Sequence, residues 1–459
     1  MKQIPLILGA LLFSTLFHKQ GIGLNLSIFS ILTIIILSIY NTNAFKQKHT
    51  LVFTALYLIT AISIFIYNNT LSIVANTVAF FTLIGEVSVQ QSSIYVNWLN
   101  GIYSFVAGFF HRNFGVNEKE QKVEHKKEID YLHLVKIIGI PLIAIILFVS
   151  LYKNGNPTFN NLINSIDFTV INFQWLLIAL CGYYLLSNIS NPVIVDPATS
   201  KDVQTKNSLP IKAFFETDGL VKEHQLGLIL ISALNLLILF FLITDITYLL
   251  SSDDLRASAF SNQVHNGINA LIASIIIAII IILYFFRGDL NFYKKNKNLK
   301  TITYTWIFLN ALLVINIIIK DIQYIYHFGL TYKRIGVLVY LLLTVIGLVT
   351  TLIKVKNLKN LIYLLRVNTA MAFTILVVSC TINWDNYITM YNLKCAKSMD
   401  FKYLIELSNN NSFTLKKYLD ENTLDSEKAF AIEQKYNNYI LELEDNTWQE
   451  YQYDNYRLN

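Results

Sequence analysis

The sequence predicts an all-α membrane protein: a polytopic bundle of about ten or eleven transmembrane helices with a small helical C-terminal tail. Hydrophobic residues make up 54% of the 459-residue chain and charged residues only 14%, against about 25% in soluble proteins. The mean hydropathy is +0.47. The apolar residues also cluster in stretches of roughly 17–22, long enough to cross a hydrocarbon core of about 30 Å at 1.5 Å per residue.

The apolar stretches define the predicted spans in chain order. They cover residues 4–17, 24–40, 51–67, 71–88, 135–152, 171–189, 226–248, 267–286, 303–319, 335–353 and 367–382. The first is short for a span, and a re-entrant or interfacial segment is the alternative. Segment 94–110 suits an interfacial helix better than a span, because Asn97, Asn100 and Ser104 interrupt its aromatic-rich run.

Lysine and arginine are distributed unevenly between the loops. With the N-terminus in the cytoplasm, the inside segments hold 22 Lys and Arg residues and the outside loops hold 6. Cytoplasmic loops of membrane proteins carry such an excess. We therefore expect a cytoplasmic N-terminus, a charged cytoplasmic loop near 111–136 and, after an odd number of spans, an extracytoplasmic C-terminus.

The domain organisation follows from the charge of the last residues. Residues 1–397 form the predicted membrane domain, and residues 398–459 form an acidic tail with twelve Asp and Glu against six Lys and Arg. The tail is predicted to contain short helices at 401–407 and 413–419 and a longer one capped by Ser426. At roughly sixty residues it has little core of its own, so we expect it to dock on the membrane domain or on a partner.

Several classes of chemistry lack their sequence signals. Three cysteines make neither a disulfide framework nor a zinc site, and none of the eight histidines lies well inside a span. No phosphate-binding loop, nucleophile elbow or nucleic-acid module is present. We therefore predict no catalytic residue, metal site or cofactor and no nucleic-acid partner, and an enzyme is not favoured.

Asp245 is the most informative polar residue of the membrane domain. It lies at the outer end of the otherwise uncharged span 226–248, where an acid usually needs a partner. The predicted orientation brings further polar residues to the same level: Arg256, His265, Lys320, Asp321, His327 and Arg334. These residues predict either an outward-facing pocket, in which Asp245 and His265 bind a ligand or move a proton, or an ion-paired lid between helix ends.

Three other residues carry specific expectations. In YHFGLTYKR at 326–334, Gly329 can adopt the left-handed conformation that ends a helix, and Thr331 can cap the next helix. Glu86, at the inner end of its span, is expected at the membrane interface rather than in the protein interior.

A set of short motifs runs in order along most of the chain. They are GIGLNLSIF at 21–29, LNLLILFFLITDITYL at 234–249, SNQVHNGINAL at 261–271, YHFGLTYKR at 326–334, YITMYN at 387–392 and MDFKYLIELS at 399–408. On these motifs the chain resembles the bacterial integral-membrane family catalogued as domain of unknown function 4173. GNPTF at 155–159 departs from it, because an acidic residue is expected before the proline. The resemblance implies a shared fold in the bacterial cytoplasmic membrane and no particular activity.

The architecture predicts a function only in outline. The small tail favours a non-enzymatic envelope protein that scaffolds, couples or senses, with the lipid bilayer as its environment and an envelope protein as a partner of the tail. The alternative is a transporter or lipid-handling protein that uses the polar site around Asp245 and His265.

Overall fold

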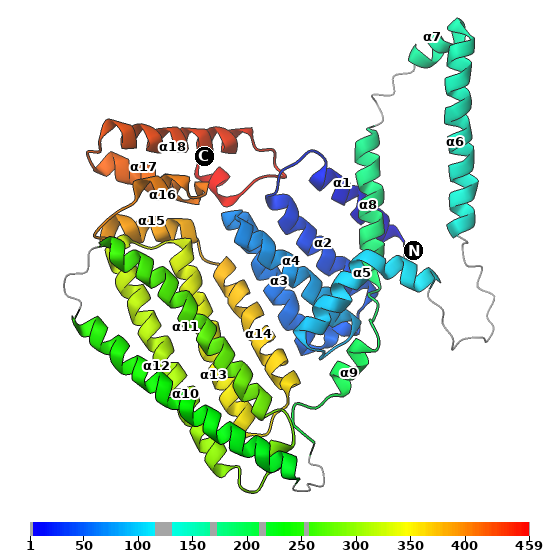
Figure 1. The fold of residues 1–459 in the computed structure, drawn as a ribbon. Coiled ribbons are helices and arrows are strands. Elements are labelled where there is room, and N and C mark those ends of the chain that lie inside the picture. Colours follow the sequence, from blue (N-terminus) through cyan, green and yellow to red (C-terminus); the bar gives the residue numbers. More distant parts are fainter. Residues whose placement is uncertain (1–2, 115–130, 166–171, 211–216, 252–256, 459) are drawn as a thin grey trace.

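The computed structural model describes residues 3–114, 131–165, 172–210, 217–251 and 257–458, and these ranges contain helices but no strands (Figure 1). The all-α prediction is confirmed. Every predicted span is a helix: α1 (Ile4–Phe17), α2 (Leu24–Tyr40), α3 (Lys48–Tyr67), α4 (Thr70–Ser88), α6 (Tyr131–Gly155), α8 (Phe173–Ser190), α10 (Asp218–Ser251), α11 (Ala257–Phe285), α12 (Lys297–Phe328), α13 (Tyr332–Lys356) and α14 (Leu361–Cys380). Most of the predicted charged loop, residues 115–130, lies outside the described residues.

Within the described ranges, seven helices are long and apolar enough to cross a membrane: α3, α4, α8, α10, α12, α13 and α14. Helices α1 and α2 and residues 269–285 of α11 are apolar but shorter. Helices α6 and α7 (Pro157–Ser165) pack on each other and stand apart from the other helices in Figure 1. These features establish a helical membrane bundle.

Helices α1–α5 and α8 form one group, called here the N-terminal bundle (Figure 1). Its core contains the fully buried side chains Tyr57, Leu83 and Leu186. Asn76 joins three helices, because its amide nitrogen donates to Ser30 Oγ at 3.0 Å and to Thr60 Oγ1 at 3.1 Å. Such hydrogen bonds between spans are an ordinary use of Asn in membranes.

In helix α5 (Ile94–Phe114) the polar side chains face the protein and the apolar ones face outward. This arrangement differs from the interfacial helix predicted for 94–110. Asn97, Asn100 and Ser104 are fully buried against the neighbouring protein. The exposed side chains are apolar: Leu99, Ile102, Val106 and Phe110. The prediction was wrong on this point, because Asn97 bonds to α4, and Asn100 and Ser104 bond to the segment after α8, instead of facing water.

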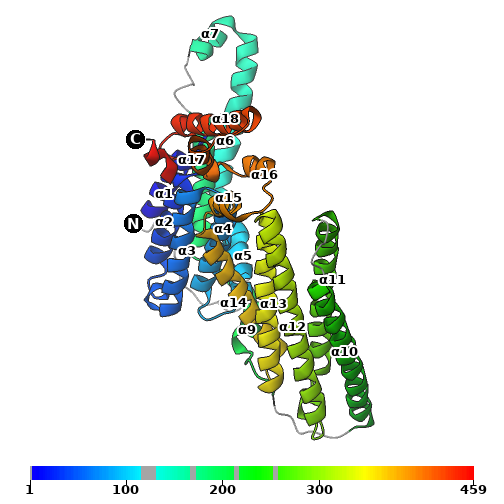
Figure 2. The ribbon, with the colours of Figure 1, turned by 90° about the vertical axis from the view of Figure 1, so that its left-hand side faces the viewer.

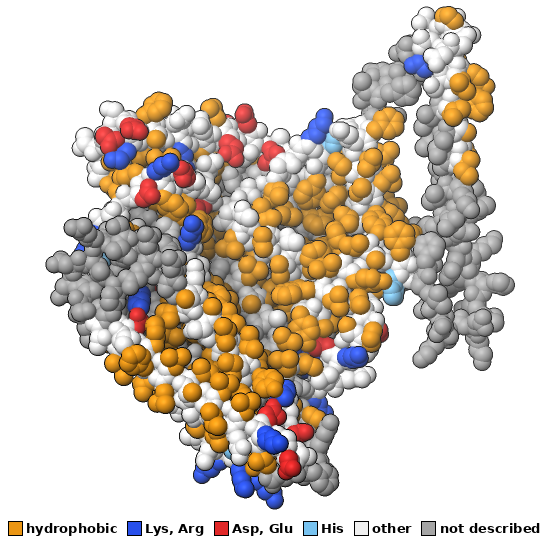
Figure 3. Space-filling model, viewed as in Figure 1, with side chains coloured by type: hydrophobic (Ala, Val, Ile, Leu, Met, Phe, Trp, Pro, Cys, Tyr) orange, Lys and Arg blue, Asp and Glu red, His pale blue; other side chains and the backbone are white. Residues whose placement is uncertain are grey.

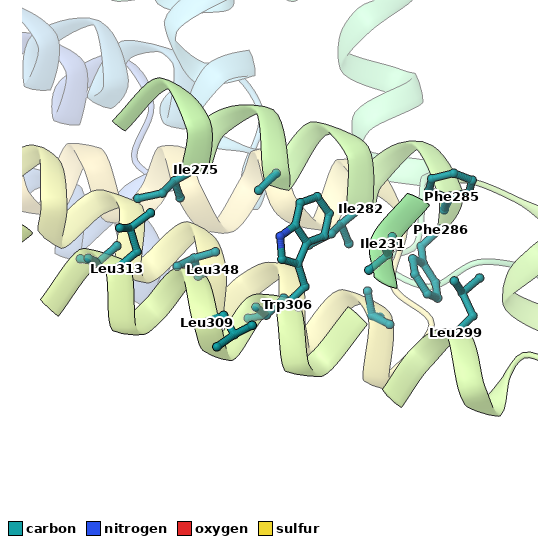
Figure 4. Close-up of a cluster of buried hydrophobic side chains, with 14 of the residues drawn as sticks. Ile231, Ile275, Ile282, Phe285, Phe286, Leu299, Trp306, Leu309, Leu313 and Leu348 are labelled. Carbon is teal, nitrogen blue, oxygen red and sulfur yellow. The ribbon is translucent and has the colours of Figure 1, made fainter. Parts of the chain in front are cut away.

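Helices α10–α13 form a second group, called here the C-terminal bundle (Figure 2). Its core runs the length of the helices and includes Ile231, Ile282, Trp306 and Leu348 (Figure 4). Helix α14 packs on α13 and also on α3, α4 and α5. It therefore lies between the two bundles.

The C-terminal tail lies across one end of both bundles (Figure 1). It consists of α16 (Phe401–Glu406), α17 (Ser412–Glu421), α18 (Ser426–Asp445) and the short helix η5 (Tyr453–Arg457), and α15 (Trp384–Cys395) precedes it. Its small core, with Leu404, Leu415 and Ile432, is continuous with residues of the α12–α13 connection. The cap of α18 is Asp425, which accepts from Lys428 N at 2.9 Å, and not Ser426 as predicted.

The end of the tail also contacts the N-terminal bundle. Leu24 N donates to Tyr451 O at 2.8 Å, and Asn25 N donates to Gln449 O at 2.7 Å. Gly21 N donates to the Glu450 carboxylate, and the Gly23 backbone lies so close to Glu450 that a Cβ there would overlap its carbonyl group. The tail thus contacts both bundles through backbone hydrogen bonds and a shared core.

Candidate functional site

Asp245 forms an ion pair that joins α10 to α12. Lys320 Nζ lies 2.6 Å from Asp245 Oδ1 and 2.7 Å from Oδ2, and Asn316 Nδ2 also donates to the carboxylate. The Lys320 and Asp245 side chains are only 15% and 12% exposed. Both oxygens of the acid are therefore occupied by the neighbouring helix, which is the geometry of an ion pair between helix ends.

Of the other predicted site residues that the structure describes, Asp321, His327 and Arg334 form no hydrogen bond or ion pair with Asp245. Asp321 is buried, and its Oδ2 has no hydrogen-bond partner among the residues that the structure describes. Arg334 donates to Phe328 O at 2.9 Å and to Gly329 O, and its guanidinium lies 4.1 Å from the centre of the Tyr324 ring. His327 is exposed at the end of α12. Arg256 and the His265 side chain lie outside the described residues.

At the α12–α13 connection, Thr331 caps α13 as predicted, and Gly329 ends α12 with a positive φ, but its ψ of 175° lies outside the left-handed helical region that was predicted. Gly329 has a φ of 79°, and the Thr331 side chain accepts from Arg334 N at 3.4 Å. Asn392 of α15 binds both backbone groups of Leu330, accepting from its N at 2.5 Å and donating to its O at 2.9 Å. Helix α15, which precedes the tail, therefore binds the connection between two spans.

Asp385 of α15 lies at the centre of a buried junction beneath the tail. It accepts from Tyr332 Oη at 2.8 Å and from Ser408 Oγ. Tyr403 Oη accepts from Tyr332 N at 2.9 Å. Three segments that are separate in the sequence, at 326–334, 387–392 and 399–408, meet around this junction.

A second polar cluster lies at the end of the bundles away from the tail, and sequence reasoning missed it. Glu86 is fully buried, not interfacial as predicted. His49 Nδ1 lies 3.2 Å from its carboxylate, and Asn97 Nδ2 donates to it at 3.0 Å. Glu86 is buried because α5 covers the end of α4, and Asn97 of α5 is its polar partner.

Asp202, in the short helix α9 (Ala198–Gln204), connects the N-terminal bundle to α14 near the same end. Its carboxylate accepts from Ser93 N at 2.8 Å and Tyr95 Oη at 2.7 Å, and Arg366 Nε approaches it at 3.3 Å. Burial alone would raise the pKa of this carboxyl, but the hydrogen bonds and the Arg366 charge hold the pKa below its ordinary value. Asp202 is therefore an ionised link between α5, α9 and α14.

An open pocket of about 450 Å³ is lined by residues of both clusters. Its wall includes His49, Gln91, Asn207, Arg366 and Phe373. His49 belongs to α3, Arg366 and Phe373 belong to α14, and Gln91 and Asn207 lie in the connections after α4 and α9. No group of three or more His, Cys, Asp or Glu side chains that could hold a metal ion occurs in the described part of the chain.

The comparisons with known proteins identify a family. The model of a family described as a domain of unknown function (DUF4153) matches residues 6–418. The chain belongs to the DUF4153 family. This finding overturns the resemblance to domain of unknown function 4173, whose short motifs were not specific enough. No curated protein matches the chain, and no solved structure does.

The extent of the DUF4153 match separates two parts of the tail. The match includes Tyr332, Asp385 and Ser408, so the junction beneath the tail belongs to the family region. It ends within α17, and α18 and η5 follow it. The long apolar helices indicate an integral membrane protein, and the family assignment names no activity.

Proposed function

We propose that this DUF4153 protein is a non-enzymatic envelope protein whose tail couples the two helix bundles to a partner. The observation that carries the proposal is the double attachment of the tail. One part of it packs on the α12–α13 connection, and the other binds residues 21–25 between α1 and α2. A change in the relative position of the bundles would therefore move the tail.

The outer face of α18 supports a partner. Phe430 and Leu441 are 68% and 59% exposed. They lie eleven residues apart, close to three helical turns, and so project from the same side. The acidic residues Glu427, Glu433 and Glu444 are exposed on the same helix, and acidic, basic and apolar side chains mix on this part of the surface (Figure 3). We infer a partner that offers basic and apolar side chains.

The paired Asp245 weakens the alternative of a transporter or lipid-handling protein that works through that residue. A binding carboxylate needs an oxygen free to meet its ligand, and here Lys320 and Asn316 contact both oxygens. We therefore assign Asp245 a structural role, and the proposed function does not use it.

The partner surface can be tested with a photo-crosslinking amino acid in living cells. Placed at Phe430 or Leu441, it should give a discrete adduct, because both positions face away from the bundles. Leu443 is the matched control, since it lies on the same helix but is buried. The adduct should disappear when Glu427, Glu433 and Glu444 are changed to Gln. If neither exposed position gives an adduct that Leu443 lacks, α18 is no docking surface and the proposal fails.

A further inference from the structure

An apolar groove lies on the membrane-facing side of the C-terminal bundle. Helices α10 and α11 both pack on α12, and between them is a groove of about 380 Å³. Its floor includes Trp306 and Leu313 of α12, both buried. In Figure 4 the Trp306 ring projects from α12 toward α11.

The lining of the groove suits a hydrocarbon chain. Leu237 and Phe241 of α10 and Ile277 and Ala278 of α11 form its sides. Leu237 and Ile277 are exposed, so the groove opens sideways along spans that face lipid. A flexible acyl chain can fill such a space and gains the dispersion contacts that its wall otherwise lacks.

The position of the groove along the helices fits one leaflet of the bilayer. From Ile281, at its lower end, to Arg287 is six residues, or roughly 9 Å of helix. One leaflet of hydrocarbon is about 15 Å deep, half of the core. A lipid whose headgroup lies at the level of Arg287 can therefore place the distal part of its chain in the groove.

Charge distinguishes the two ends of the groove. At the tail end, the nearby Lys320 is neutralised by Asp245 at 2.6 Å. At the other end, Lys294, Lys295 and Lys297 are exposed between α11 and the first turn of α12. Arg287 at that end pairs with Glu223 at 2.9 Å, whereas the three lysines form no ion pair with the described residues and outnumber the one exposed acid of the same connection, Asp289. Exposed lysines near a membrane surface attract anionic headgroups.

We propose that the groove between α10 and α11 binds one acyl chain of an anionic phospholipid whose headgroup lies at Lys294, Lys295 and Lys297. This inference does not depend on the partner proposed for α18. It concerns a structural lipid at a fixed place and implies no transport.

Ser274→Phe provides a direct test, because Ser274 lines the groove and a phenyl group there would fill it. Ala273→Phe is the matched control: it neighbours Ser274, is also exposed, and does not line the groove. Native mass spectrometry of the detergent-solubilised protein, mixed with phosphatidylglycerol or phosphatidylcholine, counts the retained lipids. The wild type and Ala273→Phe should each retain one phosphatidylglycerol molecule, which Ser274→Phe should lose. Both should retain several-fold less phosphatidylcholine than phosphatidylglycerol.

A second pair of variants gives an independent test in case Ser274→Phe fails to fold. Leu237→Trp on α10 narrows the groove from the other side, and the neighbouring, equally exposed Leu236→Trp is its control. Changing Lys294, Lys295 and Lys297 to Gln should abolish the preference for phosphatidylglycerol. Equal retention by both members of each pair, or equal retention of the two lipids by the wild type, would overturn the proposal.

Discussion

Lys320 Nζ contacts both carboxylate oxygens of Asp245, at 2.6 and 2.7 Å, and so holds α12 against α10 near the tail end of the C-terminal bundle. The pair is mostly shielded from solvent. Removing one member of such a pair leaves the other charge uncompensated in a poorly solvated place, whereas removing both does not.

Asp245→Ala should therefore destabilise the protein by about 3 kcal/mol, the lower part of the range for a broken buried pair. Asp245→Ala combined with Lys320→Met should recover most of that loss. The measurement is thermal unfolding of the detergent-solubilised protein, and Asp245→Asn separates charge from shape. If the single and double variants unfold at the same temperature as the wild type, the pair contributes nothing to stability.

Lys435 predicts a pH dependence of the tail. Its ammonium donates to Ile405 O at 2.8 Å and to Leu407 O at 2.5 Å beneath α18. Burial lowers the pKa of this amine to about 8, although the charge of Asp385 opposes the shift. Between about pH 8 and its ordinary value of 10.5, the unfolded chain holds a proton that the folded protein has released, so stability rises with pH.

The comparison is with Lys435→Met, which lacks the titrating group. Below pH 8 the stability difference between the two proteins should be constant. As the pH rises above 8, the wild type should gain stability relative to the variant in thermal unfolding. A difference that stays flat up to pH 10 would show that the amine keeps its proton in the folded protein.

The membrane orientation is a prediction from the Lys and Arg count. Lys294→Cys should be protected from an impermeant thiol reagent in intact cells, and Gln434→Cys in the tail should react. Both positions are exposed. Cys181 and Cys395 are also exposed and are first changed to Ser, while Cys380 is buried and can stay. Labelling of Lys294→Cys with protection of Gln434→Cys would reverse the topology.

Much of the fold was predictable because its signals are local. A span needs only a continuous apolar run. Gly329 and Thr331 marked the end of α12 and the start of α13, because a helix end depends on the backbone conformation and the hydrogen bonds of a few adjacent residues. The cap of α18 was misplaced by one residue because Asp425 and Ser426 are both good caps.

The polar clusters were not predictable, because their members come from distant parts of the chain. His49 and Glu86 lie 37 residues apart, and Asp202 and Arg366 lie 164 apart, with no spacing that marks them as neighbours. The polarity of α5 was misjudged for the same reason: a sequence does not show whether Asn97 meets water or another helix. Asp245 was noticed because a lone acid in an apolar span is itself a signal. Its pairing with Lys320 could not be predicted, because it depends on how α10 packs on α12.

The central claim is that the tail is fixed to both bundles, and a distance measurement across the tail contact tests it most directly. Spin labels at Thr70→Cys, at the start of α4, and Gln434→Cys, on α18, report the position of the tail relative to the N-terminal bundle by pulsed electron resonance. With Cys181 and Cys395 changed to Ser, the otherwise wild-type protein should give one narrow distance distribution. Gly23→Val, whose side chain would overlap the Glu450 backbone, should broaden it, while Gly336→Val, which faces open space, should not. A broad distribution in the wild type, or an unchanged one in Gly23→Val, would contradict the account.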